Sequence, residues 1–369
     1  MEKLWKYKKI GEVCIVERGA SPRPIDKYIT DNESGINWIK IGDTSDSMYI
    51  TETAQKIIIE GMKKSRYVKP GDFLLSNSMS FGRPYILKID GCIHDGWLVL
   101  RDENALFDKR FLYYYLSSKT TYKKLKSMAV GGVVNNLNSE MVRNVIVPVP
   151  DKEEQSEIAD LFDKIKKILD DRKQELEQLD TLVKSRFVEM FGDIITGKYN
   201  YKIRKLGDVA FIGSSHRVFT TEFVESGIPF YRGTEIGELA NGIEPSEPYY
   251  ISEEHYNKLT KDNTKPRIGD LLMPSICNKG QIWMVDTDRP FYYKDGRVLC
   301  ISPNRVIFNS KYLEYFMRIK TLVEYPKLGS GSTFAEFKIF LLKDMDVLVP
   351  PRNVQNQFAD FVASVDKSK

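Results

Sequence analysis

The sequence is poor in the residues that build metal, redox and nucleotide sites. Of 369 residues, three are histidine and four are cysteine, and no Cys-x-x-Cys pair occurs. The histidines, His94, His216 and His255, lack the spacing of a zinc site. No G-x-x-x-x-G-K-[ST] loop is present, so the usual phosphate-binding loop of NTPases is excluded. The scattered cysteines are expected to be reduced, buried thiols in a cytoplasmic protein.

Long apolar runs are also missing. No apolar stretch reaches about 18 residues, so neither a transmembrane helix nor a membrane partner is expected. The N-terminal MEKLWKYKKIGEV lacks the apolar region of a signal peptide. The Asp- or Asn-Pro-Pro-aromatic tetrad of amino-methyltransferases is absent, because VPPRN at 349–353 lacks both the polar and the aromatic flank. We therefore expect no catalytic residue and no metal here, and catalysis in partner chains.

What the chain does contain is an internal repeat. The junctions VPVPDKEEQSEIADLF (147–162) and VPPRNVQNQFADFV (349–362) carry Pro, Gln, Ala and Asp at one spacing, 200 residues apart. Collinear matches precede them: YKKIGEV with KIRKLGDV, GINWIKIGD with GIPFYRGTE, KPGDFLLSNSMSFG with RIGDLLMPSICNKG, DGWLVL with DGRVLC, and FDKRFLYYYLSSK with FNSKYLEYFMRIK. The shared positions are mostly apolar or glycine, which specify folding. The repeat predicts one scaffold used twice with different surfaces, unless it is a duplication without functional meaning.

Each copy is predicted to mix strands and helices. Short β-branched and aromatic runs between Gly, Pro, Asn and Asp predict strands in the first copy within 36–41, 72–77, 85–90 and 144–150. One amphipathic helix is expected per copy, at 111–128 and 311–325. Trp38 and Trp97 are expected in the core. The fold class is α+β: two tandem, similar mixed α/β domains, joined and followed by long helices.

The connector between the copies is predicted to be one long helix. No Pro or Gly occurs from residue 151 until Gly192, and apolar residues recur every seven positions. This coiled-coil-like pattern predicts a rod of roughly 57 Å that needs a partner helix. The packing positions are Ile158, Phe162, Ile165, Leu169, Leu176, Leu179, Val183 and Met190. Only 18 residues follow Pro351, so either the second helix is shortened or a partner chain completes it.

These features predict four segments: domains at 1–150 and 193–350, a connector at 151–192, and the start of a second helix at 351–369. Residues 151–191 hold 12 acidic and 8 basic residues, whereas the rest holds 39 acidic and 47 basic. Basic domains suit a polyanion such as DNA. Ordinary solvated charge is the alternative explanation.

The order of domain, long helix, domain and helix, with P-x(4)-Q-x(3)-A at each helix start, resembles the specificity subunit of type I restriction-modification systems. The resemblance covers essentially the whole chain and also rests on the KLGDV-like domain starts and the Gly-Asp-hydrophobic segments. It implies that each domain reads one half of a bipartite double-stranded DNA target, and that the helices fix the spacer. It further implies docking of two methyltransferase subunits, which use S-adenosylmethionine to methylate adenine at N6, and of translocating restriction subunits. The chain itself would bind no cofactor.

Candidate DNA contacts are polar residues in glycine-flanked loops between apolar runs. Arg suits guanine edges, Asn suits adenine, and Ser or Thr suits bases or phosphates, while a turn or capping role is the alternative for each. The first domain offers Ser21, Arg23, Lys40, Asp43, Asn77, Ser78, Ser80, Arg83, Asn135 and Asn136. The second domain offers Ser215, His216, Arg217, Arg232, Thr234, Glu235, Asn278, Lys279, Ser332 and Thr333.

Two other functions stay open at this point. One is a two-domain protein-interaction scaffold without specific DNA readout, in which the helix joins a partner and the basic faces are incidental. The other is an enzyme whose site follows none of the motifs considered above. Basic loop patches on the same side of both domains would favour the DNA reader. Salt-insensitive association without DNA binding would favour the scaffold, and activity of the isolated chain on DNA would favour the enzyme.

Overall fold

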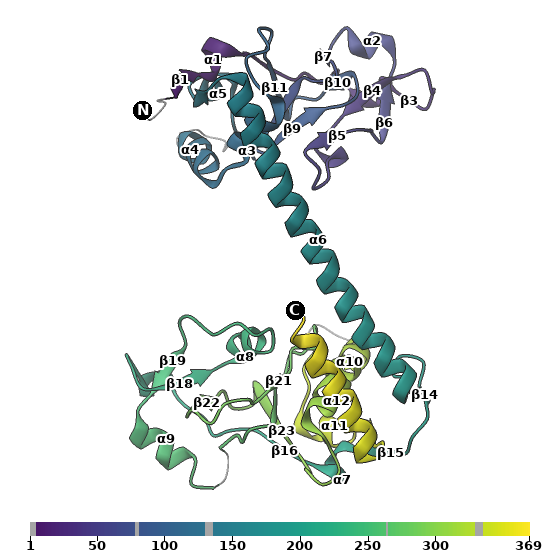
Figure 1. Cartoon of the computed structure of the whole chain (residues 1–369), viewed down its shortest axis with the longest axis vertical. Helices are drawn as coiled ribbons and strands as arrows, with labels where there is room; N and C mark the ends of the chain where they lie inside the picture. The colour runs from purple at the N-terminus through teal and green to yellow at the C-terminus, as the bar shows by residue number, and fades with distance from the viewer. Residues whose placement is uncertain (1–4, 78–80, 130–135, 263–264, 329–334) are drawn as a thin grey trace. The chain divides into compact units, whose positions relative to one another are not determined.

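The computed structural model describes residues 5–77, 81–129, 136–262, 265–328 and 335–369 (Figure 1). The chain divides into two compact units, Met1–Arg172 and Lys173–Lys369. The division falls inside the long helix α6 (Lys152–Phe191), so each unit contains one part of this helix. The predicted limits at 150 and 193 instead set the helix apart from both domains.

The first unit is built on two five-stranded sheets. One has the order β2 (Ile15–Arg18), β11 (Trp97–Arg101), β8 (Phe73–Ser76), β9 (Pro84–Leu87) and β5 (Tyr49–Ile50). The other has the order β3 (Ile29–Thr30), β6 (Gln55–Ile57), β4 (Ile36–Ile39), β10 (Gly91–Ile93) and β7 (Arg66–Val68). A separate antiparallel pair joins β1 (Lys6–Lys9) to β12 (Ile146–Val149). The four strands predicted in this copy are confirmed as β4, β8, β9 and β12.

The second unit repeats this plan. One sheet has the order β16 (Ala210–Gly213), β23 (Val298–Pro303), β20 (Leu271–Pro274) and β21 (Trp283–Met284), matching β2, β11, β8 and β9. The other has the order β17 (Phe223–Val224), β19 (Tyr249–Ile251), β18 (Ile228–Tyr231) and β22 (Tyr292–Tyr293). Here β18 pairs with β22 in parallel, as β4 pairs with β10. Two short pairs complete the unit: β13 (Gly192–Asp193) with β14 (Lys198–Tyr199), and β15 (Ile203–Lys205) with β24 (Asp346–Leu348).

Matching helices lie at matching points of the two units. The first unit contains α1 (Ile10–Val13), η1 (Ile25–Lys27), η2 (Ile41–Asp43), α2 (Ile59–Met62), α3 (Lys109–Ser117), α4 (Lys119–Ala129) and α5 (Ser139–Arg143). The second contains α7 (Leu206–Val209), η3 (Thr220–Glu222), α8 (Gly233–Leu239), α9 (Glu253–Leu259), α10 (Ser310–Glu324), η4 (Tyr325–Leu328), α11 (Ile339–Lys343) and α12 (Arg352–Asp366). The short α1 and α7 bury the apolar residues of KIGEV and KLGDV.

The helix predicted at 111–128 is wrong in one respect, because it is two helices. Ser118 ends α3 in an extended conformation, with φ −63° and ψ 144°. Its hydroxyl then accepts a hydrogen bond from Thr121 N at 3.2 Å, at the first turn of α4. Serine competes for the backbone in this way and is favoured at helix starts, so the apolar periodicity continues across a break in the backbone.

The cores contain the residues that the sequence pattern placed there. Trp38 and Trp97 are 3% and 0% exposed, which confirms their prediction as core residues. All four cysteines are buried and unpaired. In the described part of the chain, no helix combines the length and the apolar character needed to cross a bilayer.

The repeated glutamine explains the junction motif. Gln155 is fully buried, and its Oε1 accepts a hydrogen bond from Asp108 N at 2.8 Å. Its Nε2 donates to Leu106 O at 3.0 Å and to Pro150 O at 2.9 Å. The side chain thereby ties the end of β12 and the first turn of α6 to the start of α3, where Asp108 is the N-cap.

Gln355 makes the same three bonds in the second unit. Its Oε1 accepts from Asn309 N at 2.9 Å, and its Nε2 donates to Ile307 O at 3.0 Å and to Pro350 O at 2.8 Å. Asn309 is the N-cap of α10, as Asp108 is of α3. The fixed spacing of Pro and Gln in the motif therefore follows from one buried hydrogen-bond arrangement, used twice.

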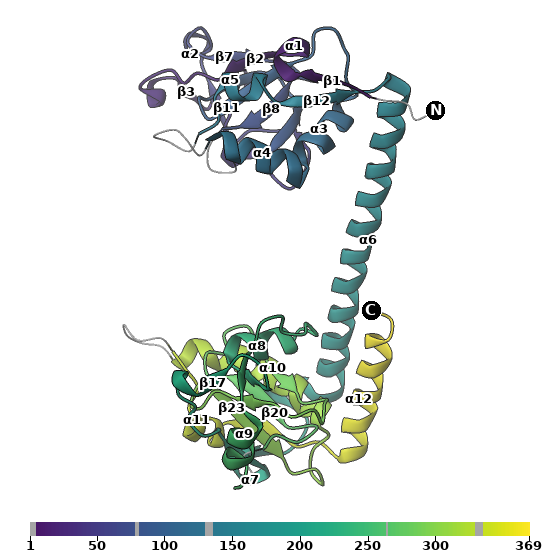
Figure 2. The same ribbon diagram turned by 90° about the vertical axis from the view of Figure 1, so that its left-hand side faces the viewer.

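Helix α6 is packed only near its ends. Ile158 packs against the first core, whereas Leu179, Val183 and Met190 belong to or pack against the second. In the second unit, α12 lies beside the last turns of α6 (Figure 2), with Phe358 5.3 Å from Phe187 between ring centroids. Between these ends the apolar side chains are exposed by 43% to 64%: Leu161, Phe162, Ile165, Ile168, Leu169 and Leu176.

Replacing Gln155 by alanine is expected to lower the free energy of unfolding of the first unit by about 3 kcal/mol, because buried backbone groups lose their partners. Urea denaturation of wild type and variant measures the difference. Gln174→Ala, at an exposed position on the same helix, is the control and should change stability by less than about 0.5 kcal/mol. Equal effects of the two substitutions would contradict the role of Gln155.

Candidate nucleic-acid interface

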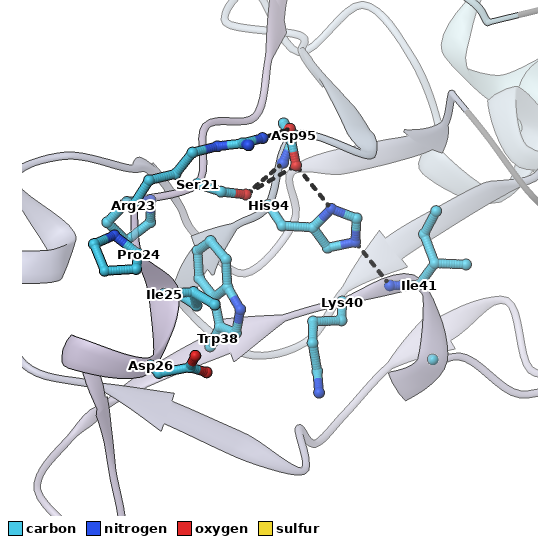
Figure 3. Close-up of a pocket in the computed structure, with 12 residues that line it drawn as sticks. Ser21, Arg23, Pro24, Ile25, Asp26, Trp38, Lys40, Ile41, His94 and Asp95 are labelled. Carbon is cyan, nitrogen blue, oxygen red and sulfur yellow. Dashed lines mark hydrogen bonds and ion pairs between the residues drawn. The ribbon is translucent and has the colours of Figure 1, made fainter.

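In the first unit, three candidate residues meet around Asp95, in the turn between β10 and β11. Figure 3 shows two of them, Ser21 and Arg23, beside this aspartate. Ser21 Oγ donates to Asp95 Oδ1 at 2.9 Å and accepts from Asp95 N at 3.2 Å. Arg23 forms an ion pair with Asp95 Oδ2 at 3.2 Å, and its side chain stays 80% exposed. Asn77 Nδ2 donates to Asp95 O at 2.8 Å. The structure thus holds the exposed guanidinium of Arg23 beside the turn that contains Asp95.

The electrostatics of this turn favour a charged Asp95. Burial acts to raise the pKa of Asp95, but the Ser21 hydrogen bond, the residue's own backbone N–H and the charges of His94 and Arg23 together lower it. Burial lowers the pKa of His94. The His94 ring lies between two backbone donors, Ile41 N at 3.2 Å and Gly96 N at 2.7 Å. A neutral imidazole carries one N–H and one acceptor nitrogen, so it can accept a hydrogen bond from only one of these two donors.

A cavity of about 750 Å³ opens beside these residues. Lys40 lines it together with Trp38, Ile41 and His94, and Arg23 stands at the same cavity (Figure 3). Lys40 Nζ donates to Gln55 Oε1 at 2.8 Å. Three of the predicted contacts, Ser21, Arg23 and Lys40, therefore share one concave surface. Its lining also contains Asp26 and Asp95, so the two cations stand beside two carboxylates.

Two predicted residues of the first unit serve the backbone instead. Asn77 is 1% exposed, and its amide is used on the Asp95 carbonyl, so in this conformation it cannot reach a ligand. Asp43 accepts from Lys40 N at 2.7 Å and from Ala54 N at 3.2 Å, which caps η2. Both correspond to the structural alternative stated for polar loop residues.

Arg83 forms a separate group. Its guanidinium lies 3.1 Å from Asp46 Oδ1 and 3.2 Å from Ser45 O, and 5.4 Å from the centroid of the Tyr85 ring. It lines a second cavity of about 490 Å³ with Phe81, Tyr113, Lys119 and Tyr122. Since Asp46 is fully exposed, this ion pair is weak, and Arg83 can exchange the carboxylate for another anionic partner.

The second unit repeats the serine and arginine arrangement. Ser215 Oγ donates to Tyr293 O at 2.6 Å, and Arg217 Nε lies 3.4 Å from Asp295 Oδ2. The Arg217 side chain is 68% exposed. His216, between them, pairs with Asp262 at 2.6 Å. Asp295, in the turn between β22 and β23, therefore holds an exposed arginine, as Asp95 does in the turn between β10 and β11.

The other described candidates of the second unit lie at the start of α8 and after β20. Arg232 forms an ion pair with the buried Glu235, whose carboxylate also accepts a hydrogen bond from Arg232 N at 2.7 Å. The Arg232 guanidinium lies 4.6 Å from the centroid of the Tyr249 ring. Glu235 is 4% exposed and serves as a cap, as Asp43 does. Thr234, Asn278 and Lys279 are exposed, whereas Asn136 of the first unit is half-buried.

Five predicted contacts lie outside the described residues: Ser78, Ser80, Asn135, Ser332 and Thr333. The structure also identifies two residues that the loop criterion missed, Asp95 and Asp295. Their signal was present in the sequence, since DGWLVL and DGRVLC match in the repeat and each begins with this aspartate. Within the described ranges, no cluster of His, Cys, Asp or Glu could hold a metal ion.

Known proteins with the same features decide the family. Residues 2–179 match the family model of the type I restriction modification DNA specificity domain. The type I restriction enzyme MjaIX specificity subunit of Methanocaldococcus jannaschii is 23% identical over 384 positions, covering 98% of this chain and 86% of that protein. Residues 2–179 belong to the family of type I restriction modification DNA specificity domains, and the relative that matches along 98% of the chain is a specificity subunit. This confirms the family that the junctions and domain starts indicate.

Solved structures of this family share the fold of the chain. The type I restriction-modification S subunit from M. genitalium has a TM-score of 0.55 at 13% identity, covering all of this chain and 90% of the other. A chain from a structure describing complex assembly and conformational transition of the type I R-M system has a TM-score of 0.60 at 17% identity, covering 99% and 90%. These specificity subunits confirm the α+β class with long helices.

The lowered pKa of His94 predicts a pH effect on the first unit. The unfolded chain takes up this proton near pH 6.5, while the folded unit takes it up only at lower pH. Between pH 7 and pH 5 the unfolded state binds more protons, so acid destabilises the unit through His94. His94→Gln should flatten this dependence in urea denaturation measured at several pH values. An unchanged slope in the variant would contradict the assignment.

Proposed function

We propose that this specificity-family chain is the non-catalytic DNA-reading component of a type I restriction-modification complex, with each unit reading one half of a bipartite duplex target. The observation that carries the proposal is the repeated strand plan with exposed arginines at matching turns and different loops around them. Phosphate contacts position a protein on duplex DNA, and base-edge contacts select the sequence. A scaffold used twice with different loops suits two readings of one kind of ligand.

The length and stiffness of α6 suit a spacer between two such readers. Its 40 residues form one uninterrupted helix, about 60 Å long at 1.5 Å per residue. Two weakly binding modules gain affinity from linkage only when the linker matches the span between their sites. A continuous helix selects one span far more sharply than a flexible Gly/Ser linker would.

The exposed apolar side chains of α6 are the proposed docking surface for partner subunits. Six of them lie between residues 161 and 176 and are 43% to 64% exposed, although the Phe162 ring stacks on Tyr114 of the first unit. Exposed apolar rows of this kind mark protein interaction sites. Two methyltransferase subunits, carrying the S-adenosylmethionine for adenine methylation, and restriction subunits are the proposed partners. The same row would serve a protein scaffold without DNA readout, which is the second candidate function.

Selection from a randomised duplex library, with the chain bound to its methyltransferase partner, tests the DNA reading. We expect two short motifs at one fixed spacing. Arg83→Ala should change the bases of one motif and leave the other unchanged, because Arg83 belongs to one unit. Equal losses at both motifs would contradict independent readers. Absence of any motif for wild type at low and high salt would favour the scaffold.

Replacing Leu169 and Leu176 by glutamate should leave the stability of the chain within about 0.5 kcal/mol of wild type, because both side chains are already exposed. The same variant should lose most of its binding to the methyltransferase subunit, measured by analytical ultracentrifugation. Gln174→Glu adds charge at an exposed position on the opposite side of the helix and is the control. Undiminished assembly of the double variant would exclude this row as the docking surface.

A further inference from the structure

The two units hold the same ion pair at the same point of the fold. In the first, Arg23 follows β2 and meets Asp95 before β11, and in the second, Arg217 follows β16 and meets Asp295 before β23. The strands concerned are paired antiparallel in both units. Each arginine stands two residues after a serine. Ser21 bonds to the Asp95 carboxylate, whereas Ser215 bonds to the carbonyl of Tyr293 at the end of β22. The pair has therefore persisted in two copies of low mutual identity.

The residues around the pair differ between the copies. Pro22 and His216 precede the two arginines, and His94 and Lys294 precede the two aspartates. Near the second cavity, Arg83 of the first unit corresponds to Gln281 of the second, after glycines with positive φ at Gly82 and Gly280. The loops have diverged in polarity and charge while the Arg–Asp pair has not.

We propose that Arg23 and Arg217 bind DNA phosphates, and so position each unit on the duplex without selecting its sequence. This inference rests on the proposed function. Two readers of different half-sites share one ligand feature, the sugar-phosphate backbone, so a cation kept in both copies matches what both targets have in common. Positions that differ, such as Arg83 and Gln281, are the ones that select bases. Arginine binds phosphate in a bidentate manner with its planar guanidinium.

The geometry permits the exchange of carboxylate for phosphate. The two guanidinium side chains are 80% and 68% exposed, and exposed ion pairs are weak, so little is lost when a phosphate takes the place of the carboxylate. In the first unit the carboxylate is itself held by Ser21 and by its own turn, which Asn77 anchors. Asn77, which the sequence predicts as a DNA contact, is buried and instead supports Arg23, the residue proposed to contact the phosphate.

The test compares Arg23→Gln and Arg217→Gln in the full chain bound to its methyltransferase partner. Affinity is measured from low to high salt on the selected duplex and on a random duplex. Each variant should make the negative slope of log affinity against log salt less steep by about 0.9, the value for one phosphate contact. Affinity should fall by the same factor on both duplexes, and the selected motifs should not change. Arg23→Lys, which keeps the charge, should restore most of the slope.

Charge-matched controls are Lys123→Gln on α4 and Lys198→Gln on β14, both at exposed positions of the two units. They should leave the slope nearly unchanged. A changed base preference in one motif would overturn the proposal and make the arginine a base reader. An unchanged slope with a lowered thermal midpoint would make the ion pair purely structural and would also overturn it. If wild type itself selects no motif, the proposed function fails, which separates that outcome from a failure of the arginine assignment.

Discussion

The structure depends on a buried amide that joins three backbone segments. In each unit one glutamine, Gln155 or Gln355, satisfies an N–H at the start of a helix and two carbonyls on neighbouring segments. A buried amide left without partners is costly, so the end of one strand, the first turn of the long helix and the cap of the amphipathic helix must come together. The helix therefore starts from each unit in the same local geometry.

This constraint separates what must stay constant from what can vary. The junction, the paired strands and the Arg–Asp turn recur in both units, whereas the loops between them differ in charge and size. A recognition protein built on this principle can change its target by changing the loops that hold the candidate DNA contacts, because those residues make none of the hydrogen bonds of Gln155 or Gln355. Asp43 and Glu235 belong to the constant part, since each caps the first helical turn after a matching strand. The residue that each one caps is a cation, Lys40 or Arg232.

Helix α6 shows the cost of a long connector. A helix of 40 residues cannot bury its apolar row against either unit along its whole length, so the side chains between residues 161 and 176 stay exposed. Packing of α12 covers only the last turns. Exposed leucine and isoleucine at this density disfavour an isolated chain in water, which is the physical reason to expect a protein partner on this helix.

The sequence by itself determined the repeat, the strands, the long helix and the glutamine junction, because these follow from local periodicity and from spacing along the chain. It also located Ser21 and Arg23, and Ser215 and Arg217, as polar loop residues. Only the tertiary structure decided that Asp95 and Asp295 hold these arginines, that Asn77 is buried, and that Ser118 divides one predicted helix into two. The pairings depend on strand register, which brings residues more than 70 positions apart into contact. The local pattern identifies the strands, but it does not say which strands pair with one another, so these contacts follow only from the sheet topology.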